Sequence, residues 1–128
     1  MFQRIAVAWD GSELAERALG LAVEFAARYE AEVVAASVVA PASPSRQRLT
    51  DAFADARAAA ERRRVPISHE IVEARRPIDG LLSFTHDHGF DLLVIGHHRD
   101  PHAGALMLHG LTEHLVSAAQ IPVLVVAG

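Results

Sequence analysis

The sequence contains neither cysteine nor lysine, and each absence excludes a kind of chemistry. Without cysteine there is no disulfide framework, no thiolate nucleophile and no cysteine-ligated metal. All twelve basic residues are arginine. Mechanisms that need lysine are therefore excluded as well, among them P-loop phosphate binding and Schiff-base catalysis. A chain without cysteine suits a reducing compartment, and we expect this protein to be cytoplasmic.

Long apolar runs and an excess of positive charge are also missing. No apolar run approaches the length that spans a bilayer, and the N-terminal segment lacks the apolar core of a signal peptide. The formal net charge of −4 gives no bulk attraction to nucleic acid or to an anionic membrane. The arginine runs 62–64 and 75–76 are expected to be solvated helix ends, where the helix dipole favours cations. We therefore expect neither nucleic acid nor membrane as a partner.

What the sequence does contain is enough apolar residues for one sizeable core. Its 128 residues are 51% hydrophobic, which predicts a single domain over residues 1–128. Five short apolar segments typical of strands alternate with four segments of helical periodicity. The expected strands are 4–9, 32–39, 67–72, 91–95 and 123–126, and the expected helices are 13–29, 49–63, 77–88 and a last one from about Leu106 or Leu108 towards Ala119. This alternation predicts an α/β fold, a doubly wound five-stranded parallel sheet with helices on both faces.

The core is predicted from the apolar faces of these segments. In the first helix, apolar residues recur at helical spacing at Leu14, Ala18, Leu21, Ala22, Phe25 and Tyr29. The residues expected to contribute most to the core of the whole chain are Leu21, Phe25, Val94, Ile95, Leu115 and Val125. Trp9 is the only tryptophan, and we expect it to pack in the core rather than to stack on a ligand.

Residues 90–112 are the best candidate for a ligand site. A buried strand is expected to end at Gly96, and a loop then leads to the start of a helix. Glycine lets backbone approach a ligand closely, and the free N–H groups of a helix start favour an anion. Ligands of such sheets bind beyond the carboxyl ends of the strands, where the winding direction reverses. Asp10 at the end of the first strand and Gly96 at the end of the fourth are both expected at that edge.

Three pieces of the sequence together resemble the universal stress protein family: VAWDGS, GFDLLVIG and LTEHLVSAAQIPVLVV. The resemblance covers essentially the whole chain and implies the strand order 3-2-1-4-5. It implies ATP or AMP as ligand, with Asp10 beside the triphosphate and the backbone of Val38 beside adenine. It also implies a homodimer through the last strand, whose apolar residues would otherwise form an exposed sheet edge.

Nucleotide-binding members of that family carry a glycine motif after the fourth strand: Gly, two residues, Gly, nine residues, Gly, then Ser or Thr. Here Gly96 matches the first glycine and Arg99 replaces the second. If the loop has the family length, His109 replaces the third glycine and Gly110 replaces the hydroxyl residue. If one residue is inserted, Gly110 is the third glycine and Leu111 replaces the hydroxyl residue.

Thr112 is a remaining hydroxyl that could contact phosphate or cap the helix. Either alignment predicts weak or no ATP binding. With the resemblance, this predicts a stress-response or regulatory interaction protein that acts as a dimer on an unidentified protein partner. No nucleophile is found, so the sequence supports no catalysis beyond slow nucleotide hydrolysis. The alternative is an adenine-nucleotide sensor or slow ATPase of the same family. A phospho-receiver or flavodoxin fold is disfavoured, because the chain lacks the lysine of the first and the hydroxyl-rich first loop of the second.

Histidines gather in the same region of the chain. Five of the eight lie at His97, His98, His102, His109 and His114. Histidine can bind zinc or nickel, but this spacing matches no metal signature, so we predict no metal site. Protonated histidine could instead contact phosphate, as could an arginine in this loop.

Overall fold

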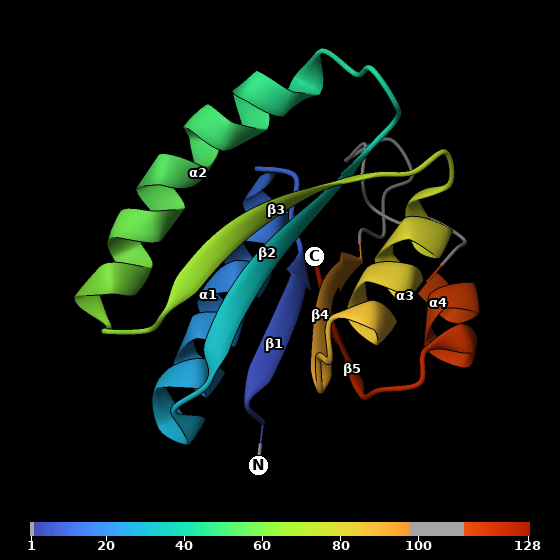
Figure 1. The fold of residues 1–128 in the computed structure, drawn as a ribbon. Helices are drawn as coiled ribbons and strands as arrows, with labels where there is room; N and C mark the ends of the chain where they lie inside the picture. The colour runs from blue at the N-terminus through green and yellow to red at the C-terminus, as the bar shows by residue number, and fades with distance from the viewer. Residues whose placement is uncertain (1, 98–111) are drawn as a thin grey trace.

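The computed structural model describes residues 2–97 and 112–128, in which strands and helices alternate (Figure 1). The strands are β1 (Arg4–Ala8), β2 (Glu32–Val39), β3 (Ile67–Glu73), β4 (Leu92–His97) and β5 (Val123–Ala127). The helices are α1 (Glu13–Tyr29), α2 (Ser45–Arg62), α3 (Pro77–Asp87) and α4 (Thr112–Ala118). All neighbouring strands run parallel, in the order β3-β2-β1-β4-β5. The predicted fold and strand order are confirmed.

Two described element boundaries differ from the sequence-based expectation by more than one residue. β4 continues through Gly96 and His97 instead of ending before Gly96, because both residues still pair with β5. The N–H of Gly128 donates to the carbonyl of His97 at 3.1 Å, just beyond the last pair. α2 begins at Ser45, four residues earlier than expected, directly after Pro44. The expected start of the last helix, near Leu106 or Leu108, lies outside the described residues.

Helices cover both faces of the sheet, so the side chains of the central strands are buried on both faces. In Figure 1, α1 lies behind the sheet and α3 and α4 lie in front of it. The core is accordingly divided into two clusters. On the face of α1 and α2, Val7 and Val94 pack with Phe53. On the opposite face, Ile95 packs with Leu81 and Leu115.

Four of the residues predicted to lie in the core are fully buried, and two are exposed. Val94, Ile95 and Leu115 are fully buried, as is Trp9, which confirms these predictions. Phe25 is partly buried against the first cluster. Leu21 and Val125, however, are 38% and 40% exposed.

The exposure of Leu21 has a simple geometric cause. The buried side of α1 carries four alanines, together with Leu14, Leu19 and Val23. This buried stripe is rotated relative to the predicted one, and Leu21 lies outside it. The exposure of Val125 has a different cause, because β5 is the last strand of the sheet and has a neighbour on one side only.

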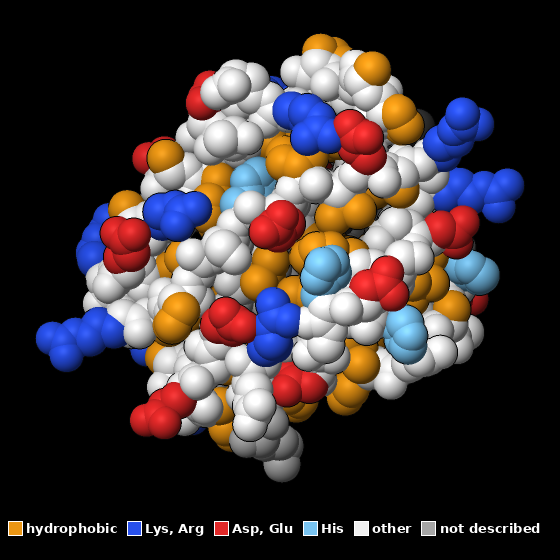
Figure 2. Space-filling model, viewed as in Figure 1, with side chains coloured by type: hydrophobic (Ala, Val, Ile, Leu, Met, Phe, Trp, Pro, Cys, Tyr) orange, Lys and Arg blue, Asp and Glu red, His pale blue; other side chains and the backbone are white. Residues whose placement is uncertain are grey.

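The surface carries charges of both signs in an interspersed pattern on the face that Figure 2 shows. Within the described residues, the large exposed hydrophobic side chains are Leu21, Tyr29, Val116 and Val125. They belong to α1, α4 and β5, and none comes from the β3 side of the sheet. No helix in the described part of the chain is long and apolar enough to cross a membrane.

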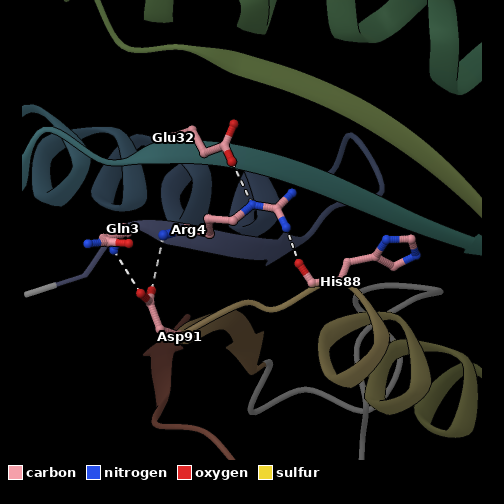
Figure 3. A network of polar contacts seen from close by, with 5 residues as sticks. All are labelled: Gln3, Arg4, Glu32, His88 and Asp91. Carbon is pink, nitrogen blue, oxygen red and sulfur yellow. Dashed lines mark hydrogen bonds and ion pairs between the residues drawn. The ribbon is translucent and has the colours of Figure 1, made fainter.

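A polar cluster ties the amino ends of the strands together (Figure 3). The carboxylate of Asp91 accepts the N–H of Gln3 at 2.8 Å and that of Arg4 at 3.1 Å. The guanidinium of Arg4 contacts Glu32 at 2.5 Å, donates to the carbonyl of His88, and lies 4.5 Å from the ring centroid of Phe90. The cluster joins β1, β2 and the segment between α3 and β4. It stabilises the amino ends of these strands, at the opposite end of the sheet from the candidate site.

The burial pattern predicts unequal effects of one substitution at two leucines. Leu115→Ala should lower the free energy of unfolding by roughly 2–5 kcal/mol, because it empties a fully buried position. Leu21→Ala is the matched control and should cost less than about 1 kcal/mol, because the side chain is already partly in water. Urea denaturation of both variants measures the difference. Equal losses would contradict the rotation of α1 described above.

Candidate functional site

The carboxyl ends of β1, β2 and β4 meet at one edge of the sheet. β1 lies between the other two strands, with Ala8 paired to Ala36 of β2 and Val7 paired to Val94 of β4. Beyond the last pair, the N–H of Trp9 donates to the carbonyl of Ala36 at 2.9 Å. α1, which follows β1, and α4, which follows β4, pack on opposite faces of the sheet, so the winding reverses between these strands. This is where ligands of parallel sheets bind.

Asp10 occupies this edge as part of a tight turn. Its Oδ1 accepts the N–H of Ser12 at 2.9 Å, and Gly11 between them has a φ of 81°, a conformation that glycine adopts readily. Ser12 then caps α1, with its Oγ accepting the N–H of Ala15 at 3.1 Å. At least one carboxylate oxygen of Asp10 therefore already serves the turn.

Val38 lies near the end of β2, and its side chain is used in packing. It packs partly buried against the cluster on the α3 face. α3 approaches here through Gly80, where an added Cβ would lie 2.6 Å from Cβ of Ala74 and 3.1 Å from Cγ1 of Val38. The side chain is therefore partly occupied by packing, and the resemblance implies a contact from the backbone at this position.

A side-chain contact connects the last residue of β4 to the first residue of α4. Gly96 is buried within the strand, and the Nδ1 of His97 lies 2.9 Å from Oγ1 of Thr112. The hydroxyl that could contact phosphate therefore already has a protein partner. The remaining predicted site residues, Arg99, His109 and Gly110, lie outside the described residues.

Metal ligands do not gather in the part of the chain that the structure describes. Across residues 2–97 and 112–128, no group of three His, Asp or Glu side chains could hold a metal ion. Two of the five clustered histidines, His97 and His114, belong to this part. The other three lie outside it.

Next to this site, β2 and β3 carry a pair of polar side chains that the sequence did not reveal as a pair. Oγ of Ser37 in β2 donates to the carbonyl of Trp9 at 2.6 Å and lies 2.8 Å from Nε2 of His69 in β3. Burial, and secondarily the charge of Arg57, lower the pKa of His69 below its ordinary value. The alternation of the segment ISHEIV was the available signal, because it places His69 on the same side as its apolar neighbours at 67 and 71.

This fold and this sequence match known proteins over nearly their whole length. The model of the universal stress protein family matches residues 1–127. A universal stress family protein from Burkholderia pseudomallei is 30% identical and superposes with a TM-score of 0.77, covering 98% of this chain and 96% of its own. No significant match was found among curated proteins.

Two more distant structures share the fold and contain nucleotides. One is a universal stress protein in complex with cAMP, at 21% identity and a TM-score of 0.76, covering 98% of this chain and 97% of its own. The other is from Archaeoglobus fulgidus in complex with dAMP, at 16% identity and a TM-score of 0.73, with the same coverage of both chains. From the family match and the Burkholderia relative, we conclude that this chain belongs to the universal stress protein family.

Proposed function

We propose that this chain is a dimeric stress-response or regulatory protein that acts through protein partners and binds ATP weakly or not at all. The observation that carries the proposal is the loop sequence, in which Arg99 replaces the second glycine of the family motif and either His109 or Leu111 replaces another motif residue. A phosphate cradle offers backbone N–H groups with no side chain in the way. A tight loop that needs glycine torsions is also strained by any other residue.

The described part of the edge supports the same conclusion. Two groups that a nucleotide would use here are already engaged: Asp10 Oδ1 in the turn and the hydroxyl of Thr112 with His97. Both groups already make hydrogen bonds at about 2.9 Å within the protein. A nucleotide contact that displaced either of these bonds would gain less than a contact to a free group.

The alternative function is an adenine-nucleotide sensor or slow ATPase. The geometry that favours it is the meeting of Asp10, the backbone of Val38 and Gly96 at one edge of the sheet. Arg99 could also compensate for lost backbone donors, because a guanidinium can hold phosphate with two hydrogen bonds. The cAMP and dAMP complexes of structurally similar proteins support this alternative.

The two edges of the sheet differ in a way that supports a dimer through β5. Arginines of α2 guard the β3 edge: Arg46 pairs with Glu73, and Arg57 donates to the carbonyl of Ile67 at 3.4 Å. Charged groups at an edge discourage pairing with another chain. β5 has the sequence VLVVA and carries no charge of its own. A second copy paired along β5 would cover this apolar edge.

For the remaining partners we propose an unidentified cytoplasmic protein and neither nucleic acid nor membrane. The net charge of −4 and the mixed charges of the face in Figure 2 support this. Two arginines of the basic runs contact carboxylates, Arg63 with Glu24 and Arg76 with Asp79. They are thus partly neutralised where a nucleic-acid surface would present free cations.

Restoring the family motif should increase ATP affinity. The variant Arg99→Gly/His109→Gly/Gly110→Ser recovers the motif at the family loop length. Calorimetry should show binding at least about tenfold tighter than in the unmodified chain, which corresponds to about 1.4 kcal/mol. As a control, adding Asp10→Ala to this variant should remove part of the gain if the nucleotide occupies the sheet edge. Micromolar ATP binding by the unmodified chain, weakened by Arg99→Gly alone, would establish the alternative function.

Charge on the β5 edge should break the dimer. Val125→Lys places two lysines close together across a two-fold pairing of β5, so sedimentation should show dimers for the unmodified chain and monomers for the variant. Ser68→Lys is the matched control, because it adds the same charge to an exposed residue of β3, and it should leave the dimer intact. A monomeric unmodified chain at micromolar concentration would refute the dimer.

A further inference from the structure

Three aromatic rings and one hydroxyl connect α2 to the middle of the sheet. We refer to Trp9, Ser37, Phe53 and His69 as the His69 cluster. The imidazole of His69 stacks on the ring of Phe53 with centroids 4.7 Å apart and an interplanar angle of 22°. It meets the indole of Trp9 edge to face at 5.2 Å, and the indole in turn meets Phe53 at 5.4 Å. The four residues come from β2, β3, α2 and the residue after β1.

The hydrogen bonds of the cluster fix where the proton of His69 sits. The hydroxyl of Ser37 has a single hydrogen, which it donates to the carbonyl of Trp9 at 2.6 Å. The contact of 2.8 Å between Ser37 Oγ and His69 Nε2 therefore requires Nε2 to be the donor. When the ring is neutral, its proton therefore sits on Nε2, and a second proton would be added at Nδ1. His69 cannot act as a base on Ser37, which is also only 1% exposed.

The charged groups that contact the cluster come from two helices. Arg57 of α2 holds its guanidinium 5.3 Å from the ring centroid of Phe53. Glu16 of α1 accepts the indole N–H of Trp9 at 2.7 Å, so this carboxylate is already engaged. The other two members of the cluster that contact His69, Trp9 after β1 and Ser37 in β2, are uncharged. A proton added to His69 would therefore place a second cation near Arg57, inside a largely buried aromatic cluster.

We propose that His69 makes the packing of α2 on the sheet sensitive to acid. In the closed form α2 is packed on the sheet; protonation of His69 weakens this packing and favours a released form in which Phe53 is uncovered. Phe53 is the one aromatic among the four buried side chains of α2, and it stacks directly on the imidazole. The effect should also reach the candidate site. The carbonyl that receives the Ser37 hydrogen bond belongs to Trp9, and the next residue is Asp10. Uncovered apolar residues on α2 would present a new surface to a protein partner under acid stress.

The sign of the pH effect follows from proton linkage. In the closed form the pKa of His69 is lowered, whereas in the released form it returns towards the ordinary value near 6.5. Above that value His69 is neutral in both forms, and the packing of α2 on the sheet has its full stability. As the pH falls through it, the released form takes up a proton that the closed form resists. The closed form therefore loses stability with each further fall in pH, until the lowered pKa is reached.

Tryptophan fluorescence provides a direct test, because the only tryptophan lies in the cluster. A titration from about pH 8 to pH 5 should change the emission of Trp9 in one step below about pH 6.5. His69→Gln keeps an N–H donor for Ser37 but does not titrate, and it should abolish the step. His86→Gln is the control, since His86 is an exposed histidine of α3, and it should retain the step. A step that persists in His69→Gln would overturn the proposal.

Hydrogen exchange distinguishes release of α2 from general unfolding. Protection factors of α2 amides should fall by up to about tenfold per pH unit, the limit for one linked proton, while those of α3 stay constant. An equal fall of the protection factors in α2 and α3 would overturn the proposal. If His69→Gln does not fold, imidazole NMR on the unmodified chain still decides: a His69 ring that titrates like the exposed histidines would refute it. These measurements depend on neither nucleotide binding nor dimerisation, so they can fail independently of the proposed function.

Discussion

Burial of the central strands on both faces is the constraint on which the rest of this structure depends. β1 and β4 lie between two helical layers, and their apolar side chains point alternately into each. Such strands cannot carry polar side chains within the sheet, because a buried polar group without a partner is costly. Polar and charged groups are therefore displaced to the ends of the strands. The Arg4 and Asp91 contacts close one end, and Asp10 and His97 occupy the other.

The same constraint makes the His69 cluster unusual. Ser37 is a polar side chain buried in the layer between α2 and the sheet, and it is tolerated because it bonds to both Trp9 and His69. His69 can serve as its partner because β3 is an edge strand that is covered incompletely. The half-buried position lowers the pKa of the ring and still leaves it partly exposed to solvent. A titratable group inside a packing contact is a physical basis for a conformational change.

The edges of the sheet also follow from this architecture. An edge strand exposes backbone groups along one side, and a parallel sheet has two such strands. In this chain α2 covers the side of β3 with two arginines, whereas the apolar β5 has no comparable protection from its own residues. Leu21, Val116 and Val125 are exposed on the elements nearest that edge. This asymmetry supports the dimer that we propose through β5.

The sequence by itself determined the alternation of elements, the parallel sheet and the burial of Val94, Ile95 and Leu115, because long apolar patterns are local and strong. Its resemblance to a family also identified the strand order and the edge at which Asp10 and Gly96 meet. Only the tertiary structure decided that α1 buries Leu19 and Val23 rather than Leu21, because the apolar residues of this helix cover more of its surface than the sheet buries. It also showed that His97 bonds to Thr112 and that Trp9, Ser37 and His69 form one cluster. These contacts join residues far apart in the chain, and their positions are set by strand pairing rather than by any local pattern.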